Sequence, residues 1–147
     1  MNIVKSSILF PEVIHLFSEH DNFIIDFLGK DSLYYTRYSE NENINEVWIA
    51  YCDDKPIGCA AYRKKSPGVG ELKRMFIKSD YRGRGISKQL LAFVEEYAKQ
   101  QGDHTLHIGT RITLEPAVTL YRTSGFMETL RNGLYAEMEK KLGDGNE

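Results

Sequence analysis

The chain has 147 residues, enough for one domain around a single hydrophobic core. Hydrophobic residues make up 41% and charged residues 27%, which is typical of a soluble globular protein, and no apolar run approaches the roughly 18 residues that span a bilayer. The net charge of −2 excludes a strongly basic nucleic-acid-binding domain, so we expect neither nucleic acid nor a membrane as a partner.

The N-terminal segment is expected to be helical. Residues 10–20 carry apolar side chains spaced for one helix face, with Pro11 in the first turn, and a second short helix is predicted over residues 21–29. A proline interrupts the first apolar stretch and no small-residue cleavage site follows it, so we predict no secretory signal. We therefore expect a cytoplasmic protein in which Cys52 and Cys59 are reduced thiols without a catalytic role.

Three short apolar and aromatic segments follow, over residues 45–54, 56–65 and 71–78. The polar DDKP between the first two is typical of a hairpin turn, and SPGVG separates the second from the third. We therefore predict three consecutive antiparallel strands. The aromatic segment over residues 33–38 lies before them and either lines a ligand pocket or packs between the early helices and the sheet, which is the interpretation that we favour.

The second part of the chain alternates helix and strand. Residues 87–101 form the clearest helix, with Ser87 as its cap and Gly102 placed for the left-handed conformation at its end. A buried strand over residues 105–109 and a helix over residues 115–124 are predicted next. The pattern is therefore that of an α/β protein.

The C-terminal segment over residues 126–142 is predicted to form two strands around the turn RNG, and residues 143–147 to be a disordered tail. One domain over residues 1–142 accounts for all of these elements. The last strands also allow pairing across a homodimer. His104 and His107 are three apart in the expected strand and would face opposite sides, so we expect no metal site.

The loop DYRGRGIS, residues 80–87, joins the third strand to the long helix. Its glycines and arginines alternate as Arg82, Gly83, Arg84 and Gly85. A helix start presents unpaired N–H groups, glycine lets the backbone approach a ligand, and arginine adds forked donors, so a pyrophosphate is the expected guest. The alternative is an ordinary solvated loop. No G-x-x-x-x-G-K-[ST] is present, and Lys88 replaces the third glycine of G-x-G-x-x-G, so neither a nucleoside triphosphatase nor a dehydrogenase is expected.

RGRGIS at residues 82–87 resembles the Gln/Arg-x-x-Gly-x-Gly/Ala signature of the GNAT superfamily of N-acetyltransferases. ELKRMFI resembles that family's fourth strand, and PAVTLYRTSGF resembles the A-I-x-L-Y-x-x-x-G-F of its last helix and following strand. The resemblance extends over about residues 47–135. It implies a GNAT-type acyl-CoA N-acyltransferase fold: an α/β (α+β, mixed-sheet) domain with a central, mostly antiparallel sheet flanked by helices.

The resemblance also implies acetyl-CoA as the cosubstrate. Backbone groups of Met75, Phe76 and Ile77 would pair with the pantetheine arm as if it were an extra strand. The amides of the loop would hold the pyrophosphate; these belong to Arg82, Gly83, Arg84, Gly85, Ile86 and Ser87. Two positions depart from the family pattern, since Ser87 replaces the usual Gly or Ala and Leu114 stands where many members have asparagine.

Two residues are implied to be catalytic. Glu71 resembles the strand glutamate that serves many relatives as a base, directly or through water; the alternative is a cross-strand ion pair with Arg63 or Lys73. Tyr121 matches the family tyrosine that faces the cofactor sulfur, where it would hydrogen-bond to the departing thiolate; the alternative is core packing. A backbone N–H near Phe76 or Ile77 would stabilise the charge on the thioester oxygen.

We therefore expect an N-acetyltransferase that moves the acetyl group of acetyl-CoA to a primary amine by direct attack. Residues 1–56 hold 4 Lys/Arg against 10 Asp/Glu and residues 57–147 hold 15 against 11, so the small-molecule acceptor is expected to be a cationic amine or an amino-acid-like molecule. Three alternatives stay open: a CoA-binding regulatory module without turnover, an enzyme acting on protein N-termini or lysine side chains, and a preference for a longer acyl group.

Overall fold

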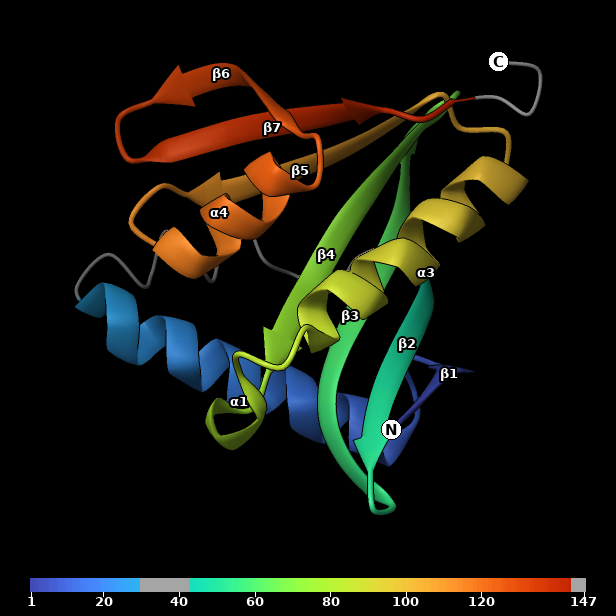
Figure 1. The fold of residues 1–147 in the computed structure, drawn as a ribbon, viewed down its shortest axis with the longest axis vertical. Coiled ribbons are helices and arrows are strands. Elements are labelled where there is room, and N and C mark those ends of the chain that lie inside the picture. Colours follow the sequence, from blue (N-terminus) through green and yellow to red (C-terminus); the bar gives the residue numbers. More distant parts are fainter. Residues whose placement is uncertain (30–42, 144–147) are drawn as a thin grey trace.

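The protein is seen in a computed structural model that describes residues 1–29 and 43–143. The described strands form one mixed sheet in the order β1-β2-β3-β4-β5-β7-β6 (Figure 1). They are β1 (Asn2–Ser6), β2 (Ile44–Cys52), β3 (Lys55–Ser66), β4 (Val69–Ile77), β5 (Thr105–Arg111), β6 (Met127–Asn132) and β7 (Tyr135–Lys141). The helices are α1 (Pro11–Leu28), α3 (Ile86–Gln100) and α4 (Glu115–Thr123), with a single 3-10 turn, η2 (Ser79–Tyr81), after β4. The predicted fold class is confirmed.

The sheet is covered on both faces, which explains the continuous apolar runs of its central strands. Along β2, Val47 and Ile49 pack in the cluster under α1, whereas Trp48 and Ala50 pack in the larger cluster that includes α3 and α4. Neighbouring residues of one strand therefore serve opposite cores, as the two-residue period of a strand requires. Figure 1 shows α1 on one side of the sheet and α3 on the other.

The order of elements matches the sequence prediction from β2 onward. The antiparallel pairing of β2 with β3 and of β3 with β4 is confirmed, and so are the two C-terminal strands. Gly102 and Gly125 end α3 and α4 with φ values of 83° and 100°. The predictions for residues 33–38 and 144–147 lie outside the described residues.

Three predictions were wrong in detail. The two early helices are one continuous helix, because its buried side keeps a helical spacing from Val13 through His20 to Ile24 and nothing breaks it. The long helix begins at Ile86 with Gly85 as its N-cap, so Ser87 is not the cap. Strand β1, which pairs antiparallel with β2, was missed, because its side chains are mostly exposed and give little apolar signal.

Strands β4 and β5 run parallel but stay together only at their beginnings. The pairing joins Val69–Glu71 to Thr105–His107 and then stops. The register of β4 against β3 shifts between Cys59 and Ala61, opposite Arg74, which has a φ of 57°. A bulge of this kind bends a strand, so β4 diverges from β5 beyond Glu71 and leaves a gap between them.

The end of the sheet at which β4 and β5 still pair is held by a buried carboxylate. The side chain of Asp103, before β5, has no exposed surface, and it accepts hydrogen bonds from the hydroxyl of Tyr62 and the ammonium of Lys64, both on β3. A Cβ added to Gly70 would lie 2.4 Å from the Tyr62 ring, so the glycine of β4 makes room for this cluster. Asp103 thereby ties the loop after α3 to the sheet.

We expect Tyr62→Phe to lower the free energy of unfolding by about 1–3 kcal/mol, because a buried carboxylate loses a hydrogen-bond donor. Urea unfolding would measure the loss. Tyr51→Phe is the matched control, because Tyr51 donates to Glu12 in a hydrogen bond that is only partly buried, and its loss should cost less. Equal losses in the two variants would show that the Asp103 cluster does not hold the sheet.

Candidate active site

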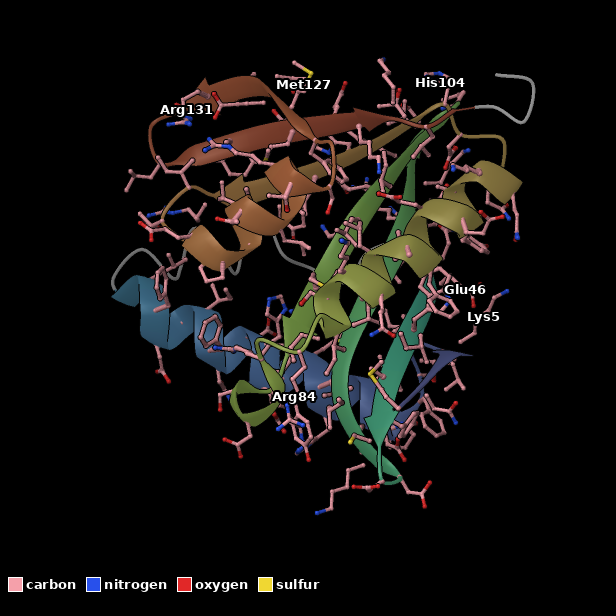
Figure 2. All side chains as sticks on the ribbon, viewed as in Figure 1. Lys5, Glu46, Arg84, His104, Met127 and Arg131 are labelled. Carbon is pink, nitrogen blue, oxygen red and sulfur yellow. The ribbon has the colours of Figure 1, made fainter. Side chains whose placement is uncertain are left out.

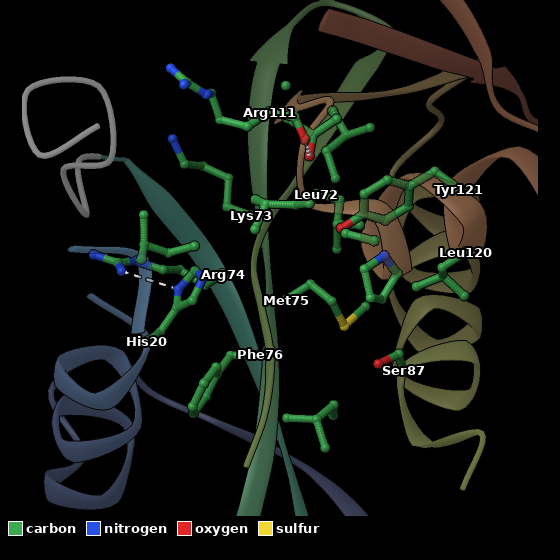
Figure 3. A pocket seen from close by; sticks show the side chains of 18 of the residues that line it. His20, Leu72, Lys73, Arg74, Met75, Phe76, Ser87, Arg111, Leu120 and Tyr121 are labelled. Carbon is green, nitrogen blue, oxygen red and sulfur yellow. Dashed lines mark hydrogen bonds between the residues drawn. The ribbon is translucent and has the colours of Figure 1, made fainter. Parts of the chain in front are cut away.

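The gap between β4 and β5 contains a pocket of about 680 Å³ (Figure 3). Its walls come from α1, β4, the loop into α3, β5, α4 and β7. Ten of the eleven residues expected from the sequence line it: Glu71, Met75, Phe76, Ile77, Arg82, Gly83, Gly85, Ile86, Ser87 and Tyr121. The eleventh, Arg84, lies on the loop but outside the pocket lining (Figure 2).

The start of α3 forms one end of the pocket. Gly83 and Gly85 have φ values of 78° and 77°, and no atom lies within 4 Å of where a Cβ would stand on either residue. No side chain of the described residues caps the helix at Gly85, so its first amides are available to a ligand. Figure 3 shows the Ser87 hydroxyl directed into the pocket. This end has the geometry of an anion site.

The two arginines of the loop are held differently from each other. The Nε of Arg82 donates to the carbonyl of Ile77 at 3.0 Å, and its guanidinium lies 4.5 Å from the ring centre of Phe23 on α1. The guanidinium of Arg84 lies 5.0 Å from the ring centre of Tyr81. Arg82 thus closes the pocket toward α1, whereas the Arg84 side chain packs on its own loop.

The middle of the pocket runs along the free edge of β4. Phe76 pairs with Cys59 and Ile77 with Gly58, so one edge of this segment belongs to β3. The other edge has no strand partner in the described part of the chain, because the pairing with β5 ends at Glu71. An unpaired edge offers its N–H and C=O groups to an extended ligand.

Glu71 lies where β4 and β5 separate, and it is engaged by two basic side chains. Nη1 of Arg63 donates to its Oε1 at 2.9 Å, and Nδ1 of His107 lies 3.0 Å from its Oε2. Burial raises the pKa of this carboxyl, but the His107 hydrogen bond, the charge of Lys73 and the Arg63 contact outweigh burial and lower it. Glu71 is therefore ionised at neutral pH.

His107, to which the sequence assigned no function, links two carboxylates. Its ring is buried, with Nδ1 against Glu71 and Nε2 at 2.6 Å from Oε1 of Glu137. Nζ of Lys65 completes the group, at 3.1 Å from the same ring nitrogen. Glu71 and Glu137 line the same pocket, and Glu137 is the more exposed of the two. The sequence signal was weak, because a single histidine in a strand has no motif.

Tyr121 on α4 is 3% exposed, and its ring makes an edge contact with Phe126 at a centroid distance of 5.7 Å. It also lines the pocket, and Figure 3 shows its hydroxyl pointing inward. Burial raises the pKa of the phenol, so it stays protonated and can donate a hydrogen bond. The Tyr121 ring therefore packs in the core while its hydroxyl faces the pocket.

Other titratable groups near the pocket are held in their uncharged form. Burial, together with the charges of Arg74 and Arg82, lowers the pKa of His20 to about 3. Burial raises the pKa of the Cys59 thiol to about 12, which makes it a poor nucleophile. Among the described residues no cluster of three His, Cys, Asp or Glu side chains could hold a metal ion. The described helices also include none that is long and apolar enough to cross a membrane.

The chain belongs to the acetyltransferase (GNAT) family, whose family model matches residues 12–126. It is 34% identical over 87 residues to mouse (Mus musculus) N-acetyltransferase 8, covering 56% of this chain and 38% of that protein. It is 28% identical over 151 residues to an IAA acetyltransferase of Azospirillum brasilense, covering 97% of this chain and 98% of the relative. The chain spans only 38–54% of the length of the first three curated relatives.

Solved structures agree with the family assignment. A crystal structure described as a putative acyl-CoA N-acyltransferase of Klebsiella pneumoniae superposes with a TM-score of 0.79 at 26% identity, covering 97% of both chains. The PaiA N-acetyltransferase of Thermoplasma acidophilum, solved in complex with coenzyme A, has the same fold, with a TM-score of 0.71 at 21% identity over 96% of this chain and 99% of that one. The predicted family is confirmed.

We expect Glu71 to titrate below its ordinary value of 4.5 and Arg63→Met to raise its pKa, because the variant removes one of the cations that stabilise the carboxylate. Carboxyl ¹³C NMR would follow the Glu71 titration in the unaltered chain and in Arg63→Met, with Glu71→Gln to assign the signal.

The stability that the Arg63–Glu71 contact contributes is present above the ordinary pKa of a glutamate and is lost as pH falls through the lowered pKa of Glu71. Arg131→Met is the control, because Arg131 pairs with exposed Glu128 on β6 and should leave Glu71 unchanged. An unaltered Glu71 titration in Arg63→Met would contradict the assignment.

Proposed function

We propose that this protein is an acetyl-CoA-dependent N-acetyltransferase that acetylates a primary amine by direct attack. The observation that carries the proposal is the continuity of two features inside one pocket: the unpaired edge of β4 and the uncapped start of α3. The amide groups of an extended ligand can pair with the unpaired edge of β4, and a pyrophosphate at the end of that ligand can bind at the start of α3. Acetyl-CoA has that chemistry and is the cosubstrate that the family uses.

The residues present fit this cosubstrate. The backbone of Met75, Phe76 and Ile77 would pair with the pantetheine amides. The space around Gly83 and Gly85, where side chains would intrude, would admit the phosphates to the amides of residues 82–87. The Arg84 side chain is outside the pocket lining, so its contribution is assigned to its backbone amide.

The chemistry is assigned to three groups. Glu71, ionised and at the pocket wall, would take the proton of the acceptor ammonium, directly or through water. Its lowered pKa makes it a weak base, so a second function is to hold the amine in position. A backbone N–H of Phe76 or Ile77 would stabilise the negative charge on the thioester oxygen.

Tyr121 would complete the reaction by donating a hydrogen bond to the thiolate as it departs. Its raised pKa favours this over full proton transfer, since a phenol is already a weaker acid than a thiol. Burial against Phe126 fixes the ring, which holds the hydroxyl in one direction.

The finer identity of the acceptor is also part of this proposal. We assign a small, amino-acid-like primary amine in preference to a cationic amine, because basic side chains outnumber acidic ones on the pocket wall next to Glu71.

Thiol release from acetyl-CoA, with and without a panel of primary amines, tests the proposal. Coenzyme A should stabilise the protein thermally, by about 2.7 kcal/mol at a ligand concentration 100-fold above its Kd. Amine-dependent release should follow with acetyl-CoA more than with propionyl- or succinyl-CoA. Stabilisation by coenzyme A without any release would instead identify a CoA-binding regulatory module. Release only with a peptide would identify a protein acetyltransferase.

We expect Tyr121→Phe to lower kcat by roughly 10–100-fold while the Kd of coenzyme A changes little, because the lost hydroxyl acts on the leaving thiolate rather than in binding. Steady-state kinetics and calorimetry separate the two quantities. Tyr97→Phe is the matched control, since Tyr97 packs against Trp48 and Tyr62 away from the pocket. Equal losses of turnover and affinity in Tyr121→Phe would assign the tyrosine to packing.

A further inference from the structure

We propose that the acceptor carries a carboxylate, and that Lys73 binds this carboxylate. The inference rests on the proposed acetyl transfer and names the class of its acceptor: an amine with a carboxylate a few ångströms from the reacting nitrogen, as in an α-amino acid. Lys73 and Arg111 both line the pocket, and Figure 3 shows both side chains extending on the side of β4 opposite Tyr121 and Ser87.

The carboxylates of this wall are already engaged. Glu71 is bound by Arg63 and His107, and Glu137 lies 2.6 Å from Nε2 of His107 and 3.6 Å from Nζ of Lys65. Neither carboxylate is within ion-pair distance of Lys73. Beyond the one amine that Glu71 receives, a second ammonium group on the acceptor would compete with these partners, whereas a carboxylate would not.

The charge of Lys73 is only partly balanced, because Glu71 acts on it without forming an ion pair. The Lys73 side chain is half-buried and makes no ion pair or hydrogen bond with the part of the chain that the structure describes. Burial lowers its pKa, and Arg63 and Arg74 lower it further, while Glu71 opposes them. Below the ordinary pKa of lysine, keeping the half-buried Lys73 ammonium charged lowers the stability of the protein without ligand. A bound anion would offset this loss of stability.

The sum of charges points the same way. In the described lining, Arg63 is paired with Glu71 and Lys65 with Glu137. The charge of Lys73 remains in excess of these two pairs, so this part of the wall favours an anionic group over a polyamine. In addition, Nε of Arg63 is buried and has no hydrogen-bond partner in the described residues.

The spacing along β4 suits a short amino acid. Glu71 and Lys73 are two residues apart on one strand and therefore share a face, about 6–7 Å apart along the strand. An amine placed at Glu71 would thus leave a carboxylate two or three bonds away within reach of the Lys73 ammonium. The opposite charges of Glu71 and Lys73 would thus orient the acceptor, with its amine at Glu71 and its carboxylate at Lys73.

The acidic residues of α1 for which the structure gives a partner do not create a competing cation site in this wall. Glu12 binds the Tyr51 hydroxyl, Glu19 lies 3.3 Å from Nζ of Lys78, and Asp21 pairs with Arg74. None of the three is part of the pocket lining. Their negative charge is used to hold α1 against the sheet.

The test compares matched acceptors with the purified full chain and acetyl-CoA. Each pair consists of an amino acid and its decarboxylated amine: phenylalanine and phenethylamine, methionine and 3-(methylthio)propylamine, 4-aminobutyrate and propylamine. The set is completed by the remaining common amino acids and spermidine. We expect at least one carboxylate-bearing acceptor to exceed its decarboxylated partner by tenfold or more in kcat/KM.

Variants assign the preference to Lys73. Lys73→Met removes the charge and keeps the length of the chain, so the preference should fall at least fivefold through a rise in KM, while the Kd of coenzyme A is retained. Lys73→Arg should restore it, and Lys73→Glu should reverse it. Lys99→Met, at an exposed position on α3, is the control and should keep the preference. Thermal unfolding checks folding, and Lys73→Met should be at least as stable as the unaltered chain.

The outcomes separate this inference from the proposed function. Amine-dependent thiol release in which the decarboxylated partners or spermidine are preferred would overturn the carboxylate inference and leave acetyl transfer intact. A preference that survives Lys73→Met and Lys73→Glu would equally overturn it. If coenzyme A binds but no acceptor of either kind releases thiol, the transfer itself fails and this inference falls with it.

Discussion

The structure depends on the departure of β4 from β5. Parallel neighbours normally stay paired, and here the ladder ends after Glu71 because the backbone of β4 is bent at Arg74. A left-handed arginine is strained, and this one is held in place by contacts to Asp21, His20 and the ring of Phe17, all on α1. The helix under the sheet therefore stabilises the bend that opens the pocket above it.

The opened edge divides the pocket into two chemically different sides. On the side of α3 and α4 the wall offers glycine backbone, Ser87 and the Tyr121 hydroxyl, which suit a large ligand with phosphates and a thioester. On the other side it offers Lys73 and Arg111, beside the ionised Glu71. A transferase needs both substrates to meet at one point, and in this fold β4 lies between the two sides.

Much of the fold and of the pocket lining could be predicted from the sequence. The loop over residues 80–87 carries its signal locally, in glycines next to a strongly periodic helix, and so the loop, α3 and the strands before it were correctly predicted. Tyr121, which lines the pocket, could be singled out because it lies in a local motif. The same local reasoning failed for β1, whose exposed side chains have no pattern, and for the continuity of α1, where the apolar spacing alone did not show whether Asp21 and Asn22 interrupt the helix.

The charge of the acceptor side could not be predicted, because it depends on pairing between distant segments. Summed over the sequence, residues 1–56 are acidic and suggest a cationic ligand. In the fold, Glu12, Glu19 and Asp21 lie outside the pocket lining, and each is bound by a neighbouring residue. His107 binds Glu71 from another strand, and Lys73 is left without a partner in the described chain. A ligand responds to the charge that remains after the internal pairs are formed, and among the described residues beside Glu71 the charge that remains is that of Lys73.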